Sequence, residues 1–318
     1  MSSAVAGPPP GAGRYAPSPT GDLHLGNLRT GLLAWLFARH SGRRFGLRIE
    51  DLDAGRVRPG IAARQRRDLE SLGLDFDPPV VIQSERVAAY EAALARLADL
   101  TYECFCTRRE IAEAASAPHG GPSRYPGTCR DLTENQRARR RAAGRVPALR
   151  IRADGAVRTV TDLLHGTVTG VVDDVVVRRP TPRSEGDGVA AYHLAVVVDD
   201  GASGVDQVVR GDDLLTSAPP QAWLADRLGL PAPTYAHVPL ALNVDGRRLA
   251  KRDGAVTLAD LAPLGWTTPR VLGLLATSLG LAEPGEPVSV DELLDRFDPA
   301  RLPRRPWTVR PAELAPPP

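Results

Sequence analysis

The strongest constraint on the fold is an alternation of short apolar segments with amphipathic helical stretches in the first hundred residues. A first strand and a Pro/Gly-rich loop lead into a helical run over residues 28–40. A compact apolar strand at 45–49 precedes a second helical stretch at 60–72, and a third unit starts at 80–82. Strands that alternate with helices in this way form a parallel sheet covered on both faces. The sequence therefore predicts an α/β fold.

The alternation breaks once, after residue 103, and resumes near residue 191. Between these points lie all three cysteines, an Arg-rich helical run and Val-rich stretches, so we expect an inserted subdomain. Both chain ends are rich in Pro and Ala without periodicity, and we expect them to be poorly ordered. We expect a disordered tail at residues 1–13 and the first half of the core at 14–103, followed by the insertion at 104–190. The second half of the core is expected at 191–245, and a helical region with a Pro-rich tail at 246–318.

The composition excludes a wholly disordered chain, because 42% of the 318 residues are hydrophobic and 25% are charged. A net charge of +2 gives no overall basic character, so any contact with nucleic acid must come from a local patch. The candidate patch is an arginine run that is more often a solvated helix face than a tRNA contact. Its members are Arg137, Arg139, Arg140, Arg141 and Arg145.

Cysteine usage and hydropathy predict where the protein works. Three cysteines without a secretion signal favour free thiols or a metal site in a reducing compartment, so we expect a cytoplasmic protein. The apolar run at 32–37 is interrupted by Arg39 and His40, and no stretch is long enough to cross a bilayer. We therefore expect a soluble protein with no membrane partner.

The loop over residues 14–27 has the sharpest chemical signal. It joins the first strand to the first helix, where ligands of open α/β sheets gather and where free N–H groups at the helix N-terminus attract phosphate. His24 could donate hydrogen bonds to phosphate oxygens, and Gly26, without a Cβ, would let a flat base approach the backbone. A lone loop histidine is more often structural, so this interpretation depends on a second signal.

The second signal is a basic loop at residues 247–254. Lys251 is a compact cation that could close over departing pyrophosphate, although an ordinary solvated turn has the same composition. The two loops together resemble the paired nucleotide signatures of class I aminoacyl-tRNA synthetases, the first in His24-Leu25-Gly26-Asn27 and the second in Arg248-Leu249-Ala250-Lys251-Arg252. Asn27 stands where the family has histidine, and Lys251 alone remains of the two lysines in the second signature.

This resemblance implies a Rossmann-like class I synthetase sheet and an ATP site in which His24 and Lys251 are catalytic. Magnesium is expected to arrive with ATP. The residues that the resemblance assigns to ATP are His24, Gly26, Asn27, Arg248, Leu249, Ala250, Lys251 and Arg252.

Further segments resemble the glutamyl-tRNA synthetases in particular, at residues 14–26, 47–53, 83–86, 192–195 and 209–215. Glutamate has two carboxylates and an ammonium group, so its pocket needs cationic forks and an acidic partner. Arg14 and Arg210 could also form ordinary surface ion pairs, but their positions beside strand ends favour a role in the binding site. The resemblance assigns L-glutamate to Arg14, Tyr15, Ala16, Pro17, Ser18, Glu50, Tyr192 and Arg210, with Glu50 facing the ammonium group.

The three cysteines of the insertion suggest a structural zinc site. Zinc normally takes four ligands, so Cys104, Cys106 and Cys129 need one more, and general chemistry favours His119. The chain also resembles a short branch of the glutamyl-tRNA synthetase family whose zinc site has three cysteines and a tyrosine, which selects Tyr125 and leaves His119 as the alternative. Reduced cysteines without metal are a further alternative.

That short branch lacks the anticodon-binding domain, and only about 60 residues follow the second signature. It attaches glutamate to queuosine in the anticodon of tRNA(Asp), so the resemblance implies an ATP-dependent ligase that is monomeric and activates glutamate without tRNA. Two rivals remain at this point: a truncated glutamyl-tRNA synthetase that charges the 3′ end of tRNA(Glu), and a non-catalytic paralogue that binds tRNA or nucleotide.

Overall fold

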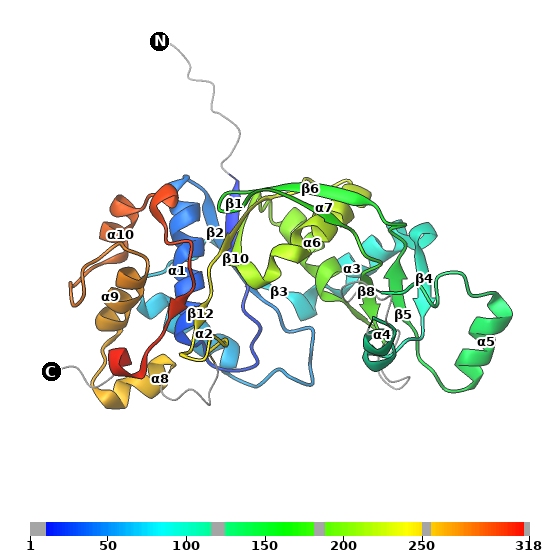
Figure 1. Cartoon of the computed structure of the whole chain (residues 1–318), viewed down its shortest axis with the longest axis horizontal. Helices are drawn as coiled ribbons and strands as arrows, with labels where there is room; N and C mark the ends of the chain where they lie inside the picture. Colours follow the sequence, from blue (N-terminus) through cyan, green and yellow to red (C-terminus); the bar gives the residue numbers. More distant parts are fainter. Residues whose placement is uncertain (1–10, 116–124, 181–187, 250–255, 315–318) are drawn as a thin grey trace, which may run out of the picture.

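The computed structural model describes residues 11–115, 125–180, 188–249 and 256–314. The molecule is elongated, with a parallel sheet near its middle (Figure 1). The C-terminal helices lie at one end, on the left of the view, and the cysteine-containing segment with helix α5 lies at the other. None of the helices in the described part combines the length and the apolar surface needed to cross a bilayer.

The core sheet has the strand order β3-β2-β1-β10-β11, with neighbours in parallel. Its strands are β1 (Ala12–Tyr15), β2 (Arg44–Ile49), β3 (Val81–Ile82), β10 (Gln207–Gly211) and β11 (Thr234–Val238). The two halves of the sheet join where Ala12 of β1 bridges Val205, just before β10. The strand order therefore reverses direction between β1 and β10, which is where open α/β sheets bind their ligands.

Helices cover both faces of this sheet. Helix α1 (Leu25–His40) packs so closely on β1 that a Cβ added to Gly13 would lie 2.9 Å from Ala38. Helix α6 (Tyr192–Ala202) lies on the opposite face, and its Asp200 reaches Arg14 of β1. The remaining helices near the core are α2 (Ile61–Ser71), α3 (Val87–Arg96) and α7 (Ala218–Arg227).

The cysteine-containing segment forms an antiparallel sheet of its own. Its strand order is β4-β5-β8-β9, with β4 (Thr101–Cys104), β5 (Ala148–Ile151), β8 (Val176–Arg179) and β9 (Val189–Ala190). Two helices accompany this sheet, α4 (Arg108–Ala115) and α5 (Glu134–Ala142). Strand β4 already belongs to this sheet, so the change of architecture begins at Thr101 rather than at residue 104.

A hairpin within the expected insertion returns to the core. Strands β6 (Val157–Asp162) and β7 (Gly166–Val171) are antiparallel to each other, and β6 pairs with β11 through Asp162 and Tyr235. The segment 104–190 is therefore not one separate unit in space. The hairpin extends the core sheet and places Asp162 beside β11.

The C-terminal region is mainly helical, as its sequence predicts, and packs against α1. It contains α8 (Leu258–Leu261), α9 (Thr268–Ser278), α10 (Val290–Arg296) and the short pair β12 (Ala241–Leu242) and β13 (Trp307–Thr308). Short 3-10 turns in the chain cover Gln83–Arg86, Ala98–Leu100, Asp212–Ser217, Ala262–Leu264, Pro299–Arg301 and Pro311–Leu314.

Candidate active site

The first signature forms the N-terminus of α1. Nδ1 of His24 accepts the backbone N–H of Asn27 at 3.2 Å, and Oδ1 of Asn27 accepts the His24 N–H at 3.3 Å. An imidazole nitrogen that accepts a hydrogen bond carries no proton, so the proton of the neutral ring is on Nε2. The backbone N–H of residue 27 therefore holds the His24 ring in one orientation and one tautomer, and the Asn27 side chain, where this chain departs from the usual signature, completes the cap through the His24 backbone.

Gly26 lies in a tight contact within the chain. A Cβ at this position would be 3.0 Å from Cε1 of His24 and 3.2 Å from Cβ of Ala241. Any larger residue would displace the histidine ring or β12. The glycine is thus needed for packing at the N-terminus of α1, and its contact with a base stays a prediction.

The chain that follows the second signature meets the first signature. The Leu25 N–H donates to the Val256 carbonyl at 2.8 Å, and His24 forms an antiparallel bridge with Thr257. On the other side, Arg248 bridges Leu242 of β12 and pairs with Asp213, which follows β10. Ala250, Lys251 and Arg252 lie outside the described residues. The segment directly after the second signature, more than 200 residues from the first in sequence, thus lies at the N-terminus of α1.

Arg14 and Glu50 belong to one buried charge cluster at the ends of β1 and β2. Oδ1 of Asp200 lies 3.3 Å from Nε of Arg14 and 2.5 Å from Nη1 of Arg48, and Nη2 of Arg48 lies 3.2 Å from Oε1 of Glu50. Burial raises the pKa of Glu50 against the opposing effects of Arg48 and Arg14. Burial acts in the same direction on Asp200, but the two arginines outweigh it and lower the pKa of that carboxyl.

Arg210 is held at the end of β10 by four groups. Its Nε donates to Nε2 of His237 at 3.0 Å, and its Nη1 lies 2.7 Å from Oε1 of Gln221 and 3.4 Å from the Tyr192 hydroxyl. The fourth partner, the Leu214 carbonyl, accepts from Nη2 at 3.3 Å. The guanidinium therefore cannot turn freely and is aimed before any ligand binds.

His237 must be neutral to accept from Arg210. Its Nδ1 lies 2.6 Å from Oδ2 of Asp162 and donates to it, which leaves Nε2 without a proton as the acceptor. Burial, with help from the nearby Arg210 charge, lowers the pKa of His237 and keeps the ring neutral at physiological pH, although Asp162 opposes the shift. The β6–β7 hairpin thus orients a candidate substrate arginine through Asp162 and His237.

The loop after β1 reaches the site mainly through its backbone. The Tyr15 hydroxyl donates to the Asn27 carbonyl at 2.9 Å, so this side chain supports the start of α1. The Pro17 carbonyl accepts the Glu50 N–H at 3.0 Å, and the Ser18 carbonyl accepts Nε2 of Gln65 at 3.1 Å. Ala16, Pro17 and Ser18 therefore lie between Arg14 and Glu50 on one side and α2 on the other.

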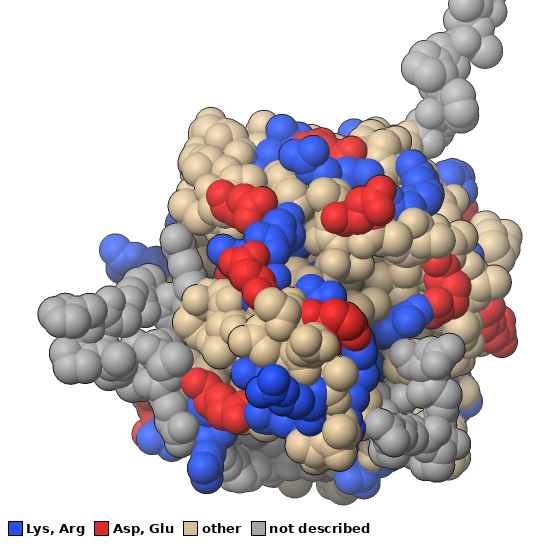
Figure 2. Space-filling view, turned by 90° about the vertical axis from the view of Figure 1, so that its right-hand side faces the viewer, with Lys and Arg blue, Asp and Glu red and all other residues tan. Residues whose placement is uncertain are grey.

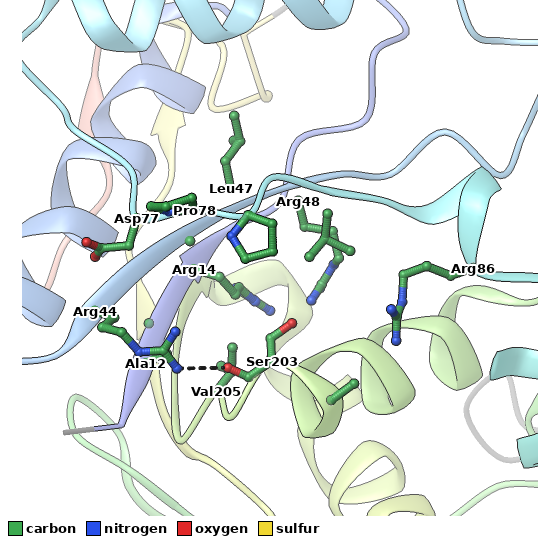
Figure 3. A pocket seen from close by; sticks show the side chains of 15 residues that line it. Ala12, Arg14, Arg44, Leu47, Arg48, Asp77, Pro78, Arg86, Ser203 and Val205 are labelled. Carbon is green, nitrogen blue, oxygen red and sulfur yellow. Dashed lines mark hydrogen bonds between the residues drawn. The ribbon is translucent and has the colours of Figure 1, made fainter. Parts of the chain in front are cut away.

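A cavity of about 280 Å³ lies behind Arg14 and Arg48 on the face of the sheet opposite α1 (Figure 3). It is lined by β1, β2, the Pro78 loop and the end of α6, and Arg44 closes one side by donating to the Ser203 carbonyl at 3.4 Å. No described residue of either nucleotide signature lines it. We therefore assign the substrate to the strand-end side of the arginine cluster and not to this cavity.

A larger cleft, of about 830 Å³, lies on the other side of Tyr192. Tyr192 and His193 line one wall, the segment after Glu50 lines a second, and Cys104 and Cys106 with the edge of the antiparallel sheet line the third. Tyr192 is 38% exposed although its hydroxyl contacts Arg210, so it separates the arginine site from the cleft. The cleft therefore adjoins the arginine site at Tyr192.

The three cysteines and Tyr125 come together as a compact cluster. The sulfurs lie within 4.8 Å of one another, and the Tyr125 oxygen lies 3.3 Å from the Cys104 sulfur and 3.9 Å from the Cys106 sulfur. Cys106 and Cys129 are 3.6 Å apart, close to the edge of about 3.8 Å of a tetrahedron with zinc–sulfur bonds of about 2.3 Å. His119 lies outside the described residues. The donor set fits a four-coordinate zinc ion.

The cluster is electrostatically prepared for a cation. Burial opposes ionisation of Cys104, but interactions with Tyr125, the Cys106 backbone and Arg150 outweigh it and lower the pKa of this thiol. Burial and the neighbouring Cys104 and Cys129 raise the pKa of Cys106 to about 12. A metal ion would remove this mutual repulsion, because it binds the thiolate form of each cysteine.

The arginine run of α5 is largely ion-paired. Arg141 contacts Glu103 and Glu134, and Arg145 contacts Glu110. Figure 2, which faces this end of the molecule, shows basic side chains interspersed with acidic ones. The run is thus mainly a paired helix face, as the more common interpretation of its sequence predicts.

Several functional residues were missed by the sequence reasoning. Asp200, His237 and Gln221 hold the assigned arginines, Arg48 contacts Glu50 and Asp200, and each of the four is less than 10% exposed. The available signal was a charged or polar residue inside an apolar run, as in Leu47-Arg48-Ile49. Such a residue can be recognised as unusual, but its partner lies far away in sequence.

The fold and this site define a class of protein. The family described as tRNA synthetases class I (E and Q), catalytic domain, matches residues 12–314. A crystal structure of a glutamate tRNA ligase from Elizabethkingia meningosepticum, in complex with its amino acid, superposes with a TM-score of 0.79 at 27% identity and covers 95% of this chain and 68% of that one. The chain belongs to the class I tRNA synthetases.

Curated relatives narrow this class to one branch. The glutamyl-Q tRNA(Asp) synthetase of Nocardia farcinica is 65% identical over 94% of this chain and 93% of its own length. That of Cutibacterium acnes is 54% identical over 87% of this chain and 78% of its own. The chain belongs to the glutamyl-Q tRNA(Asp) synthetase family. A glutamate–tRNA ligase of Thermosynechococcus vestitus is 38% identical over 91% of this chain and 62% of its own length.

Proposed function

We propose that this enzyme activates L-glutamate with ATP and transfers it to the queuosine of tRNA(Asp). The observation that carries the proposal is the pairing of His24 and Leu25, at the N-terminus of α1, with Val256 and Thr257, which follow the second signature. The N-terminus of a helix attracts phosphate through free N–H groups and its dipole. An ATP bound there has its α-phosphate next to the ends of β1 and β10.

Glutamate binds through complementary charges. Glu50 accepts the ammonium group, and Arg14 and Arg210 bind the carboxylates with fork-shaped pairs of N–H donors. Because Arg210 is already aimed by His237 and Gln221, little rotational freedom is lost when the substrate arrives. The carboxylate oxygen attacks the α-phosphorus of ATP, the bond to the leaving pyrophosphate breaks, and glutamyl-adenylate forms.

His24 and the second signature stabilise the charge that moves to the departing phosphates. The proton on Nε2 of His24 makes this nitrogen a hydrogen-bond donor, since Nδ1 is occupied by Asn27. Lys251, with Arg248 and Arg252, neutralises the pyrophosphate, and the magnesium ion that accompanies ATP screens the same charge. Positioning and charge stabilisation supply most of the acceleration.

The acceptor nucleoside approaches through the cleft beside Tyr192. With a volume of about 830 Å³, the cleft is within the range of ligand sites, roughly 300–1,000 Å³, and Tyr192 on its wall contacts Arg210. A hydroxyl of the queuosine cyclopentenediol attacks the activated carbonyl, and AMP leaves. The names of the curated relatives favour this acceptor over a terminal adenosine.

A structural zinc ion completes the insertion. The proposal names Cys104, Cys106, Cys129 and Tyr125 as its ligands, on the geometry of the donor set. Bound there, the ion would link β4 to the segment around Tyr125 and Cys129 and would stabilise the wall of the cleft. It supplies no step of the reaction.

The acceptor is tested by mapping labelled glutamate on tRNA(Asp) with and without queuosine. We expect label only on the queuosine-containing tRNA, in the anticodon fragment after nuclease digestion. Label on the terminal adenosine of unmodified tRNA would identify a 3′-end-charging glutamyl-tRNA synthetase instead. If no glutamyl-adenylate forms at all, the protein is a non-catalytic paralogue.

A further inference from the structure

The zinc ligand set, if filled as proposed above, has an uncompensated charge. Zinc binds cysteine as thiolate, and a ligating tyrosine contributes a phenolate. Three thiolates and one phenolate around a divalent ion leave two formal negative charges. Cys104 and Cys129 are buried, so this charge would be poorly solvated.

Two arginines lie directly against these ligands. Nη1 of Arg140, on α5, is 3.9 Å from the Cys129 sulfur. The guanidinium carbon of Arg150, on β5, is 4.0 Å from the centre of the Tyr125 ring. They approach from different elements and contact different ligands.

Neither arginine is neutralised by another group. Other arginines around the cluster, Arg141 and Arg145, pair with glutamates, whereas Arg140 and Arg150 have no carboxylate partner among the described residues. Arg150 is only 9% exposed, and its Nη1 is anchored by the Asp174 carbonyl at 2.5 Å. Two positive charges without a carboxylate partner, of which that of Arg150 is anchored, therefore remain beside the cysteines and Tyr125 in the described part of the chain.

We propose that Arg140 and Arg150 balance the charge of the metal centre, so that a three-thiolate, one-phenolate zinc site is neutral as a unit. This inference rests on the zinc proposal and adds two residues that act through the ligands and do not bind the ion. It also gives Arg140 a role that separates it from the ion-paired arginines of α5.

Charge balance at the metal centre also affects the cleft. Cys104 and Cys106 line the same cleft as Tyr192, so an uncompensated centre would present negative charge to a polyanionic RNA at this wall. The neutral unit removes that repulsion. Arg150 also lines the cleft, whereas Arg140 is not among its lining residues. Loss of Arg140 should therefore raise the KM for tRNA(Asp), most strongly at low salt, and leave glutamate-dependent ATP–pyrophosphate exchange unchanged.

The direct test is zinc affinity of the full-length protein, measured by competition with a chromogenic chelator. Arg140→Gln and Arg150→Gln should each weaken zinc binding about 10- to 100-fold, the range found when groups that contact metal ligands are removed. Arg140→Lys should recover most of the loss, because it keeps the charge. Arg139→Gln is the matched control, an exposed arginine on the same helix, and should bind zinc as the unaltered protein does.

The outcomes separate this inference from the zinc proposal. If the unaltered protein binds no zinc, both are wrong. If it binds zinc and the two glutamine variants retain full affinity, only the charge-balance inference is wrong. Circular dichroism shows whether the variants fold, and the thiolate charge-transfer absorption of the cobalt-substituted variants shows whether the ligand set still assembles. Weaker zinc binding by a folded variant supports the inference. Weaker binding that lysine does not recover contradicts the charge explanation.

Discussion

At the residue scale, the candidate site depends on side chains whose orientation is set before substrate binds. His24 is held by Asn27, and Arg210 is held by His237 and Gln221. Of these holders, the sequence marks Asn27 as part of the first signature but does not mark His237 or Gln221. The chemistry assigned to the site can therefore be separated experimentally from its structural support.

His24 combines two roles that substitution can distinguish. His24→Ala removes the N-cap and should lower stability by about 1 kcal/mol, with a loss of ATP–pyrophosphate exchange of about 10²-fold or more. His24→Asn keeps a side-chain oxygen for capping, so its urea denaturation midpoint should match that of the unaltered protein while exchange is still lost. Exchange that survives in a folded His24→Asn variant would show that the imidazole only caps the helix.

Arg210 should determine the affinity for glutamate. Arg210→Gln removes a buried positive charge that we expect to bind a carboxylate of glutamate, and such a loss costs about 2–4 kcal/mol of binding free energy. The kcat/KM for glutamate in the exchange reaction should therefore fall about 10²- to 10³-fold. The KM for ATP should change little. Arg158→Gln, which replaces a half-buried arginine of β6 that pairs with Asp226 of α7, is the control and should behave normally. An unchanged KM for glutamate would remove Arg210 from the pocket.

At the element scale, α1 joins the nucleotide signature to the rest of the molecule. Arg29 on this helix is 2% exposed and donates to the Pro239 carbonyl at 2.7 Å and to the Ser278 hydroxyl at 3.0 Å. It thereby ties the sheet, α1 and α9 together. Burial, partly opposed by Asp212, lowers the pKa of Arg29 to about 10, so the side chain is still charged at neutral pH.

Replacing Arg29 by Met should destabilise the protein by about 1–3 kcal/mol, because buried carbonyl and hydroxyl groups lose their donor. Chemical denaturation measures this change. Arg66→Gln on α2 removes an exposed pair with Glu70 and should stay within about 0.5 kcal/mol of the unaltered protein. Equal stability of the two variants would mean that α1 is not held through Arg29.

The elements predicted from local pattern agree with the structure, and those that depend on distant pairing do not. The strand at 45–49 and the helix at 60–72 lie within a residue of β2 and α2. The return of β6 and β7 to the core was not predicted, because nothing local to Asp162 indicates its pairing with Tyr235. The same limit applies to Arg48 and Asp200, which are 152 residues apart and share one hydrogen bond.

At the scale of the whole molecule, the resemblance supplied what periodicity could not. The residues assigned to glutamate lie at the ends of β1, β2 and β10, with Tyr192 on α6, and the helical pattern alone would not have placed them together. Tyr125 lies within the cysteine cluster, in agreement with the branch resemblance and not with general zinc chemistry. Its role as a ligand stays a prediction until zinc is measured.

The central claim is that one ATP and one glutamate are enclosed between the first signature and the segment around Lys251. Exchange of labelled pyrophosphate into ATP, without tRNA, tests it most directly. The account predicts exchange that requires glutamate in the unaltered protein and its loss in Lys251→Ala. Near-normal exchange in Lys251→Ala, or none in the unaltered protein, would contradict it.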